Sequence, residues 1–163
     1  MKATYRYRLT RGPFMFGHGR LMWVMSNPST ADESVDDPTI RRVMSFTEAH
    51  GFQSLTVVNL FAARSTDPKG LALFDDPVGP ENLETIRAEF ALTDGLVFAW
   101  GASLTPRLAT LRPPVEQMAE AAGLDPWCLG TTVAGNPLHP LYLRADTKFR
   151  PYVSRCDASA ASV

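Results

Sequence analysis

The chain has 163 residues, of which 45% are hydrophobic, and a net charge of −1 at pH 7. This length and composition suit one compact domain, which we place at residues 1–154, followed by a flexible C-terminal tail at residues 155–163. Two cysteines are too few for a disulfide framework or a four-thiolate metal site. The near-neutral charge also disfavours the strongly basic kind of nucleic-acid-binding domain.

The first residues alternate polar and aromatic side chains and do not form an apolar signal core. No apolar stretch in the sequence approaches the roughly 20 residues of a membrane span. We therefore expect a cytoplasmic protein without a membrane partner.

Four short apolar runs, rich in β-branched and aromatic residues, predict buried strands. They cover residues 21–25, 55–58, 96–100 and 127–132. Because most of them do not alternate apolar with polar residues, they suit strands that are covered by helices on both faces.

Helical patterns lie between these runs. Residues 37–51 begin with the capping residue Asp37, carry a proline in the first turn and end on a glycine. Apolar spacing predicts two more helices, at residues 80–92 and 105–123, and a pair of prolines interrupts the second so that its main part is 115–122. This order predicts an α/β fold with three layers (α/β/α) and a central, mostly parallel, four-stranded sheet.

A polar motif follows each predicted strand. The loops after parallel strands gather at the carboxyl edge of a sheet, where such folds bind ligands, so we expect the motifs to line one pocket. The motifs are Ser26-Asn27-Pro28-Ser29-Thr30, Asn59-Leu60-Phe61-Ala62-Ala63-Arg64, Trp100-Gly101-Ala102-Ser103 and Asn136-Pro137-Leu138-His139-Pro140. The candidate substrate contacts among them are Ser26, Pro28, Ser29, Asn59, Phe61, Arg64 and Trp100.

The order of the motifs resembles that of the uracil-DNA glycosylase superfamily, and the side chains of Asn27, Asn59 and His139 suit the chemistry that this resemblance implies, cleavage of an N-glycosidic bond. Such cleavage leaves an anionic base, so donors are needed at the base and a water must be held at the sugar. Asn59 and His139 can supply the donors, and Asn27 can orient the water. The structural alternatives are an Asx-turn at Asn27 and a loop-tying role for His139. Phe61 and Trp100 either stack on the base or belong to the core.

Three acids, Asp32, Asp36 and Asp37, follow the first motif. Asp37 fits a helix cap, and Asp36 and Asp37 both complement the helix dipole. The alternative is that one of the three acids is a base that activates the water. Arg64 contacts either an anion or a surface acid. No two of the three histidines have the spacing of metal ligands, so we expect neither a metal nor a cofactor.

These motifs also carry a resemblance to a known family. The segments 27–32, 36–42, 58–68 and 139–143 look like a bacterial and phage family, domain of unknown function 1643. The resemblance extends from about Arg6 to Tyr152 and implies no activity.

The order of the motifs more distantly resembles the uracil-DNA glycosylase superfamily. That resemblance implies that Asn27 orients the attacking water, Asn59 reads the base edge and His139 stabilises the departing base. It also implies that Leu143 is a wedge that fills the gap left by a base extruded from duplex DNA. Ser26 stands where that superfamily has a glycine, and Asn27 stands where its strongest enzymes have a carboxylate.

We therefore expect a DNA glycosylase-like hydrolase that acts in DNA repair or modification. Its substrate would be a pyrimidine-like or modified base in DNA or in a nucleotide, and no protein partner is indicated. One alternative, which the near-neutral charge and Asn27 favour, is a nucleotide- or DNA-binding module that keeps the pocket without the chemistry. Another is a transferase that moves a base or sugar between small metabolites.

Overall fold

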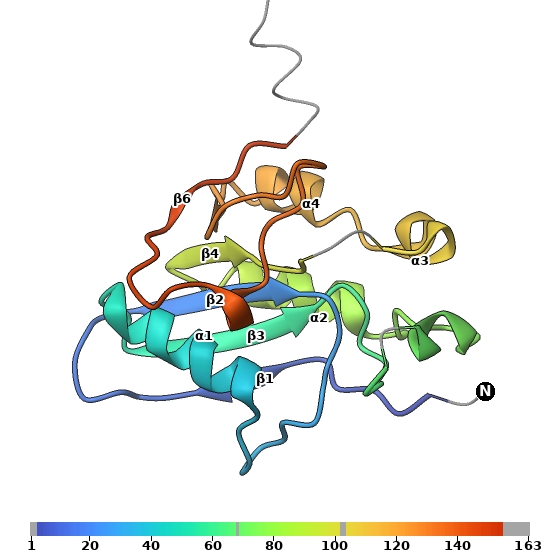
Figure 1. Cartoon of the computed structure of the whole chain (residues 1–163), viewed down its shortest axis with the longest axis horizontal. Helices are drawn as coiled ribbons and strands as arrows, with labels where there is room; N and C mark the ends of the chain where they lie inside the picture. The colour runs from blue at the N-terminus through green and yellow to red at the C-terminus, as the bar shows by residue number, and fades with distance from the viewer. Residues whose placement is uncertain (1–2, 68, 102–103, 155–163) are drawn as a thin grey trace, which may run out of the picture.

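The computed structural model describes residues 3–67, 69–101 and 104–154. They form a six-stranded sheet with the order β1-β3-β2-β4-β5-β6 and with helices on both faces (Figure 1). The strands are β1 (Leu9–Arg11), β2 (Arg20–Met25), β3 (Ser54–Asn59), β4 (Gly95–Phe98), β5 (Trp127–Cys128) and β6 (Arg150–Pro151). The helices are α1 (Pro38–Ala49), α2 (Asn82–Phe90), α3 (Pro106–Leu111) and α4 (Val115–Ala121), with short 3-10 helices η1 (Gly70–Leu73) and η2 (Pro140–Tyr142). The expected tail, 155–163, and Ala102 and Ser103 of the third motif lie outside the described residues.

The sheet is mixed but mostly parallel. Strands β3, β2, β4 and β5 run parallel, and β1 and β6 add an antiparallel strand at each edge. The prediction of four strands is therefore wrong in number. The edge strands hold only three and two residues, too few to produce a hydrophobic pattern in the sequence. β5 is shorter than the predicted run because the chain after it turns back, with Thr131 bridged to Pro137.

The direction of winding reverses between β2 and β4. After β2 the chain passes through α1 to β3 on one side, and after β3 it returns through α2 to β4 on the other side of β2. In open α/β sheets, ligands bind outside the carboxyl ends of the strands at such a reversal. The topology therefore places the loops after β2 and β4 where a binding site is expected.

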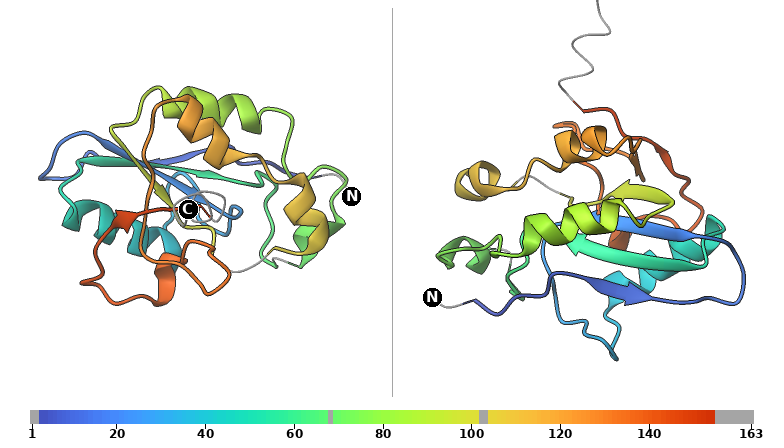
Figure 2. Two further views of the ribbon diagram at one scale, coloured as in Figure 1. Left: turned by 90° about the horizontal axis from the view of Figure 1, so that it is seen from above. Right: turned by 180° about the vertical axis from the view of Figure 1, so that it is seen from behind.

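The side chains of β2 show how the two faces of the sheet are built. Met22 and Val24 belong to the buried cluster that includes residues of α2 and α4, whereas Leu21, Trp23 and Met25 belong to the cluster that includes α1. Figure 2 shows α1 on one side of the sheet and α2 and α4 on the other. Because both faces are covered, β2 is a continuous apolar run, as the sequence suggested.

The predicted helices are confirmed, with small differences at their ends. The Asp37 carboxylate caps α1 by accepting a hydrogen bond from the Ile40 N–H at 2.8 Å, and the chain leaves the helix through Gly51, whose φ is 83°. The break between α3 and α4 falls at the predicted pair of prolines. In the part of the chain that the structure describes, no helix is long and apolar enough to cross a membrane.

Candidate functional site

A cavity of about 540 Å³ lies at the carboxyl edge of the sheet, where β2, β3 and β4 end. Its volume is in the range of small-molecule binding sites. It brings together six of the predicted site residues: Ser26, Asn27, Ser29, Asn59, Trp100 and His139. A larger cavity, of about 670 Å³, lies beside α4 and is lined by none of the predicted site residues.

Main-chain pairing fixes the loops of this cavity relative to one another. Met25 and Asn59 are paired in the β2–β3 register, so these two strands end together. The Gly101 N–H donates to the Pro137 carbonyl at 2.8 Å. That bond fastens the segment that carries His139 to the loop after β4.

Gly101 gives the His139 segment room to approach. Its φ is +81°, and a Cβ added there would lie 3.1 Å from the His139 Cβ. We expect Gly101→Ala to lower the free energy of unfolding by about 1–2 kcal/mol and, by displacing His139, to weaken ligand binding. Urea unfolding and ligand titration measure the two effects.

Gly123→Ala is the matched control for this substitution. Gly123 also has a positive φ, +70°, but an added Cβ would meet nothing within 4 Å. This variant should show the backbone strain without the loss of binding. Equal ligand affinity in the wild type and Gly101→Ala would contradict the positioning role of Gly101.

Asn59 lines the cavity and has a buried side-chain nitrogen that is unsatisfied within the described part of the chain. The residue is only 2% exposed and lines the cavity wall. Its side-chain Nδ2 is buried and has no hydrogen-bond partner among the described residues. A buried donor without an acceptor costs about 1–3 kcal/mol. The amide is therefore available to an acceptor on a ligand.

The Asn27 side chain is oriented by two main-chain acceptors. Its Nδ2 donates to the carbonyls of Pro28 and Ser65, each at 3.1 Å. Both amide hydrogens are used in this way, which leaves Oδ1 as an acceptor at the cavity wall. An amide oxygen held like this can accept a hydrogen bond from a water and so orient it, but it cannot serve as a base.

His139 uses one ring nitrogen to hold its loop. Its Nδ1 accepts a hydrogen bond from the Leu141 N–H at 3.2 Å, so the proton of the neutral ring is on Nε2. Burial lowers the pKa of His139 below its ordinary value, and the Asp37 carboxylate partly opposes that shift. The loop-tying role and a ligand role are thus compatible, because the Nε2–H remains as a donor at the cavity.

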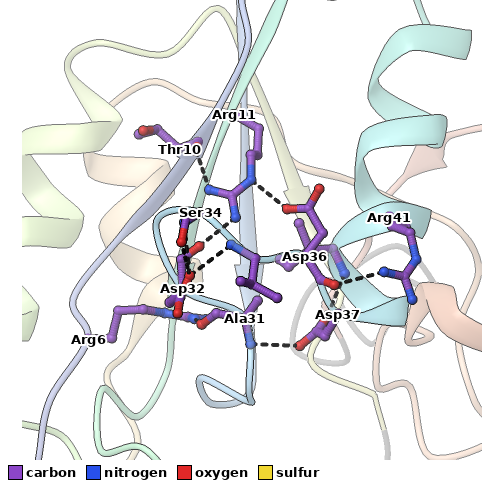
Figure 3. A network of polar contacts seen from close by, with 11 residues as sticks. Arg6, Thr10, Arg11, Ala31, Asp32, Ser34, Asp36, Asp37 and Arg41 are labelled. Atoms are coloured by element: carbon purple, nitrogen blue, oxygen red, sulfur yellow. Dashed lines mark hydrogen bonds and ion pairs between the residues drawn. The ribbon is translucent and has the colours of Figure 1, made fainter.

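The three acids after the first motif have other partners (Figure 3). Asp32 accepts hydrogen bonds from backbone N–H groups of its own turn, Asp36 accepts one from Arg11 at 2.7 Å, and Asp37 caps α1. None of the three lines the cavity. Among the described residues, no three His, Cys, Asp or Glu side chains are grouped so that they could hold a metal ion.

Asp37 joins the first motif to α1. Besides capping the helix, its carboxylate accepts hydrogen bonds from the Ser29 hydroxyl and from the Ala31 N–H at 3.3 Å. Burial raises the pKa of this carboxyl, but the hydrogen bonds outweigh burial and hold the pKa of Asp37 below its ordinary value. The ionised form is therefore the one that the fold stabilises.

We expect Asp37→Ala to lower the free energy of unfolding by about 2 kcal/mol near pH 7. Because the folded-state pKa is lowered, this contribution is present above the unfolded pKa of about 4 and is lost as pH falls through the folded-state value. Urea unfolding at about pH 7 and about pH 3 measures the difference, with the exposed α1 variant Glu48→Ala as control. The same loss at both pH values would contradict this assignment.

Four predicted ligand contacts do not line the cavity: Pro28, Phe61, Arg64 and Leu143. Phe61 is 0% exposed and packs in the core, because strand pairing continues past β3 through its N–H, which donates to the Ser26 carbonyl at 3.0 Å. Leu143 packs against the buried cluster on the α1 face. Pro28 is buried and Arg64 is half-buried beside the site. In the structure, the side chains of these four residues thus lie outside the wall of this cavity.

Trp100 belongs to both the core and the cavity wall. It lines the cavity but is 4% exposed, and its ring centroid lies 4.9 Å from that of Phe98. The Arg112 guanidinium lies 5.0 Å from the centroid of the Trp100 ring. The ring therefore closes one side of the cavity.

Two cations at the cavity, Arg6 and Lys69, escape prediction from the sequence. The Arg6 N–H donates to the Ala62 carbonyl at 2.9 Å, which lays the N-terminal segment along the loop after β3. Lys69 stands at the start of η1, on the same loop. The signal for this segment in the sequence is its polar-aromatic alternation around Arg6, a pattern of the kind found in edge strands.

A comparison with protein-family models matches residues 6–141 to a family described as "Protein of unknown function (DUF1643)". The match agrees with the first resemblance drawn from the motifs. No curated protein and no solved structure matches the chain, and nothing in these comparisons supports the more distant resemblance to uracil-DNA glycosylases.

Proposed function

The chain belongs to the DUF1643 family, and from its cavity we propose that it recognises a nucleobase and hydrolyses the N-glycosidic bond that joins the base to a sugar. The observation that carries this proposal is that Asn59 lines the cavity while its buried side-chain nitrogen, Nδ2, has no hydrogen-bond acceptor among the described residues. The carbonyl oxygens of a pyrimidine-like base are acceptors of the required kind.

The three polar side chains at the cavity have complementary roles in this reaction. The bond between the sugar C1′ and the base nitrogen breaks, and the electron pair leaves with the base. Asn59 and the Nε2–H of His139 donate hydrogen bonds to oxygens of the base, where negative charge develops. A water held by Asn27 Oδ1 adds to C1′, its proton passes to solvent, and solvent protonates the base.

A second candidate, a binding module without chemistry, is favoured by a different observation. No aspartate or glutamate is among the described residues that line the cavity, so no general base is at hand for the water. Asn59 and His139 would then bind a base without cleaving its bond to the sugar.

The motif order also supports, as part of this proposal, a fold of the uracil-DNA glycosylase type. Each of the motif residues Asn27, Asn59 and His139 lines the same cavity at the carboxyl edge of the sheet. That convergence is what the resemblance requires.

A single-turnover cleavage assay tests the proposed reaction. The substrates are oligonucleotides with uracil, mismatched thymine or modified bases, and the corresponding free nucleotides. Formation of abasic DNA or free base by the wild type is expected, and binding without release of base would select the second candidate. Failure to bind any base-containing substrate would contradict both.

A further inference from the structure

We infer that the ligand of this cavity is a free mononucleotide whose phosphate lies beside Arg6 and Lys69. This inference rests on the proposed function, because Asn59 and His139 are taken to bind the base. It adds the class of substrate, a single nucleotide in preference to a DNA strand.

The charged side chains that line the cavity are of one sign. Arg6 and Lys69 line it, and no aspartate or glutamate does so among the described residues. The chain as a whole has a net charge of −1, so this positive cavity is a local feature. Cationic side chains that meet at one cavity favour an anionic ligand group.

Arg6 is held in place and is only partly satisfied. Its guanidinium donates to the Ala31 carbonyl, while its buried Nε has no hydrogen-bond partner in the described part of the chain. No described carboxylate forms an ion pair with it. Burial and then the nearby Arg64 guanidinium lower the pKa of Arg6 from its ordinary value, and the Asp37 carboxylate partly opposes that shift. An anion at Arg6 would accept hydrogen bonds from the guanidinium and would stabilise its charged form against burial and the repulsion from Arg64.

Three observations favour a mononucleotide over duplex DNA. The cavity volume of about 540 Å³ suits a small molecule. Leu143, the residue expected to fill the gap behind an extruded base, packs half-buried against the α1-face cluster, and its carbonyl accepts a hydrogen bond from Arg42. A duplex is bound through several Lys and Arg contacts to phosphates, which a chain of charge −1 does not favour.

Isothermal titration of the full chain at low salt tests this inference. The probes are uridine, uridine 5′-monophosphate, inorganic phosphate and a single-stranded oligonucleotide with one uracil. We expect the monophosphate to bind about 10- to 100-fold more tightly than uridine and at least as tightly as the oligonucleotide. Arg6→Gln and the exposed Lys69→Gln should each reduce this preference, and Lys148→Gln, outside the cavity, should not.

Two results separate this inference from the proposed function. Equal affinities for uridine and its monophosphate, or tighter binding of the oligonucleotide, would overturn the inference that the ligand is a mononucleotide. Base recognition would still stand. Equal affinities for inorganic phosphate and the monophosphate, with no binding of uridine, would overturn base recognition. The inference of a nucleotide ligand would then fall as well. Lys69→Gln keeps the test decisive if Arg6→Gln does not fold, since Lys69 is exposed.

Discussion

Replacing Asn59 by leucine should make the free protein more stable and abolish its affinity for a base. The substitution removes a buried amide nitrogen that has no hydrogen-bond partner in the described part of the chain, so the free energy of unfolding should rise by about 1–2 kcal/mol. The same substitution removes the donor that meets the base, and the affinity for uridine should fall about 100-fold. Urea unfolding and calorimetric titration of one preparation give both numbers.

Asn82→Leu is the matched control, because Asn82, the first residue of α2, is also a buried asparagine. Its Nδ2 donates to the carbonyls of Asn59 and Leu60 at 2.9 and 3.2 Å. This variant should therefore be less stable than the wild type. If Asn59→Leu were also destabilised and still bound uridine, the Asn59 amide would have a structural role and no role in recognition.

His139→Ala should lower the single-turnover rate of base release about 100- to 1000-fold. The variant loses the Nε2–H donor that stabilises the departing base but keeps Asn59 and the rest of the cavity. Base binding should therefore change less than the rate does. Rapid-quench measurements at saturating protein isolate the chemical step.

The pH dependence of this rate follows from the protonation of His139. Burial lowers its pKa below the ordinary 6.5, so the neutral ring, with Nδ1 bonded to the Leu141 N–H, persists below that pH. The rate should stay level through pH 6.5 and fall only in more acidic solution, where a proton on Nδ1 breaks that bond. His139→Ala should lack this acidic decline, whereas the exposed His18→Ala should behave as the wild type. A wild-type rate that begins to fall above pH 6.5 would contradict the assignment.

The sequence predicts that the polar motifs meet at one cavity, because each motif follows a strand and the parallel strands end at the same edge of the sheet. The apolar runs that became β2, β3 and β4 are buried, and at or just after the end of each lies a residue that lines the cavity: Asn27, Asn59 and Trp100. The cap of α1 by Asp37 could also be predicted, because the start of a helix has a local signature in the sequence.

The parts that could not be predicted depend on contacts between distant segments. Arg6 reaches the cavity because the N-terminal segment pairs with the loop after β3, where Tyr5 bridges to Ala63. Phe61 lies within the second motif and Leu143 shortly after the fourth, but the chain turns each side chain toward the core. No local pattern in the sequence distinguishes a side chain that faces a cavity from one that faces the core at such positions.

The central claim, that the buried Asn59 amide binds an oxygen of a nucleobase, is tested most directly by nuclear magnetic resonance of that side chain. In ¹⁵N-labelled protein, the Asn59 Nδ2 resonances are assigned by their loss in Asn59→Leu and followed during titration with uridine 5′-monophosphate. We predict that one of the two amide protons moves downfield and exchanges more slowly with solvent as the complex forms. Saturating binding that leaves both protons unchanged would show that the base does not meet Asn59, and would contradict the account.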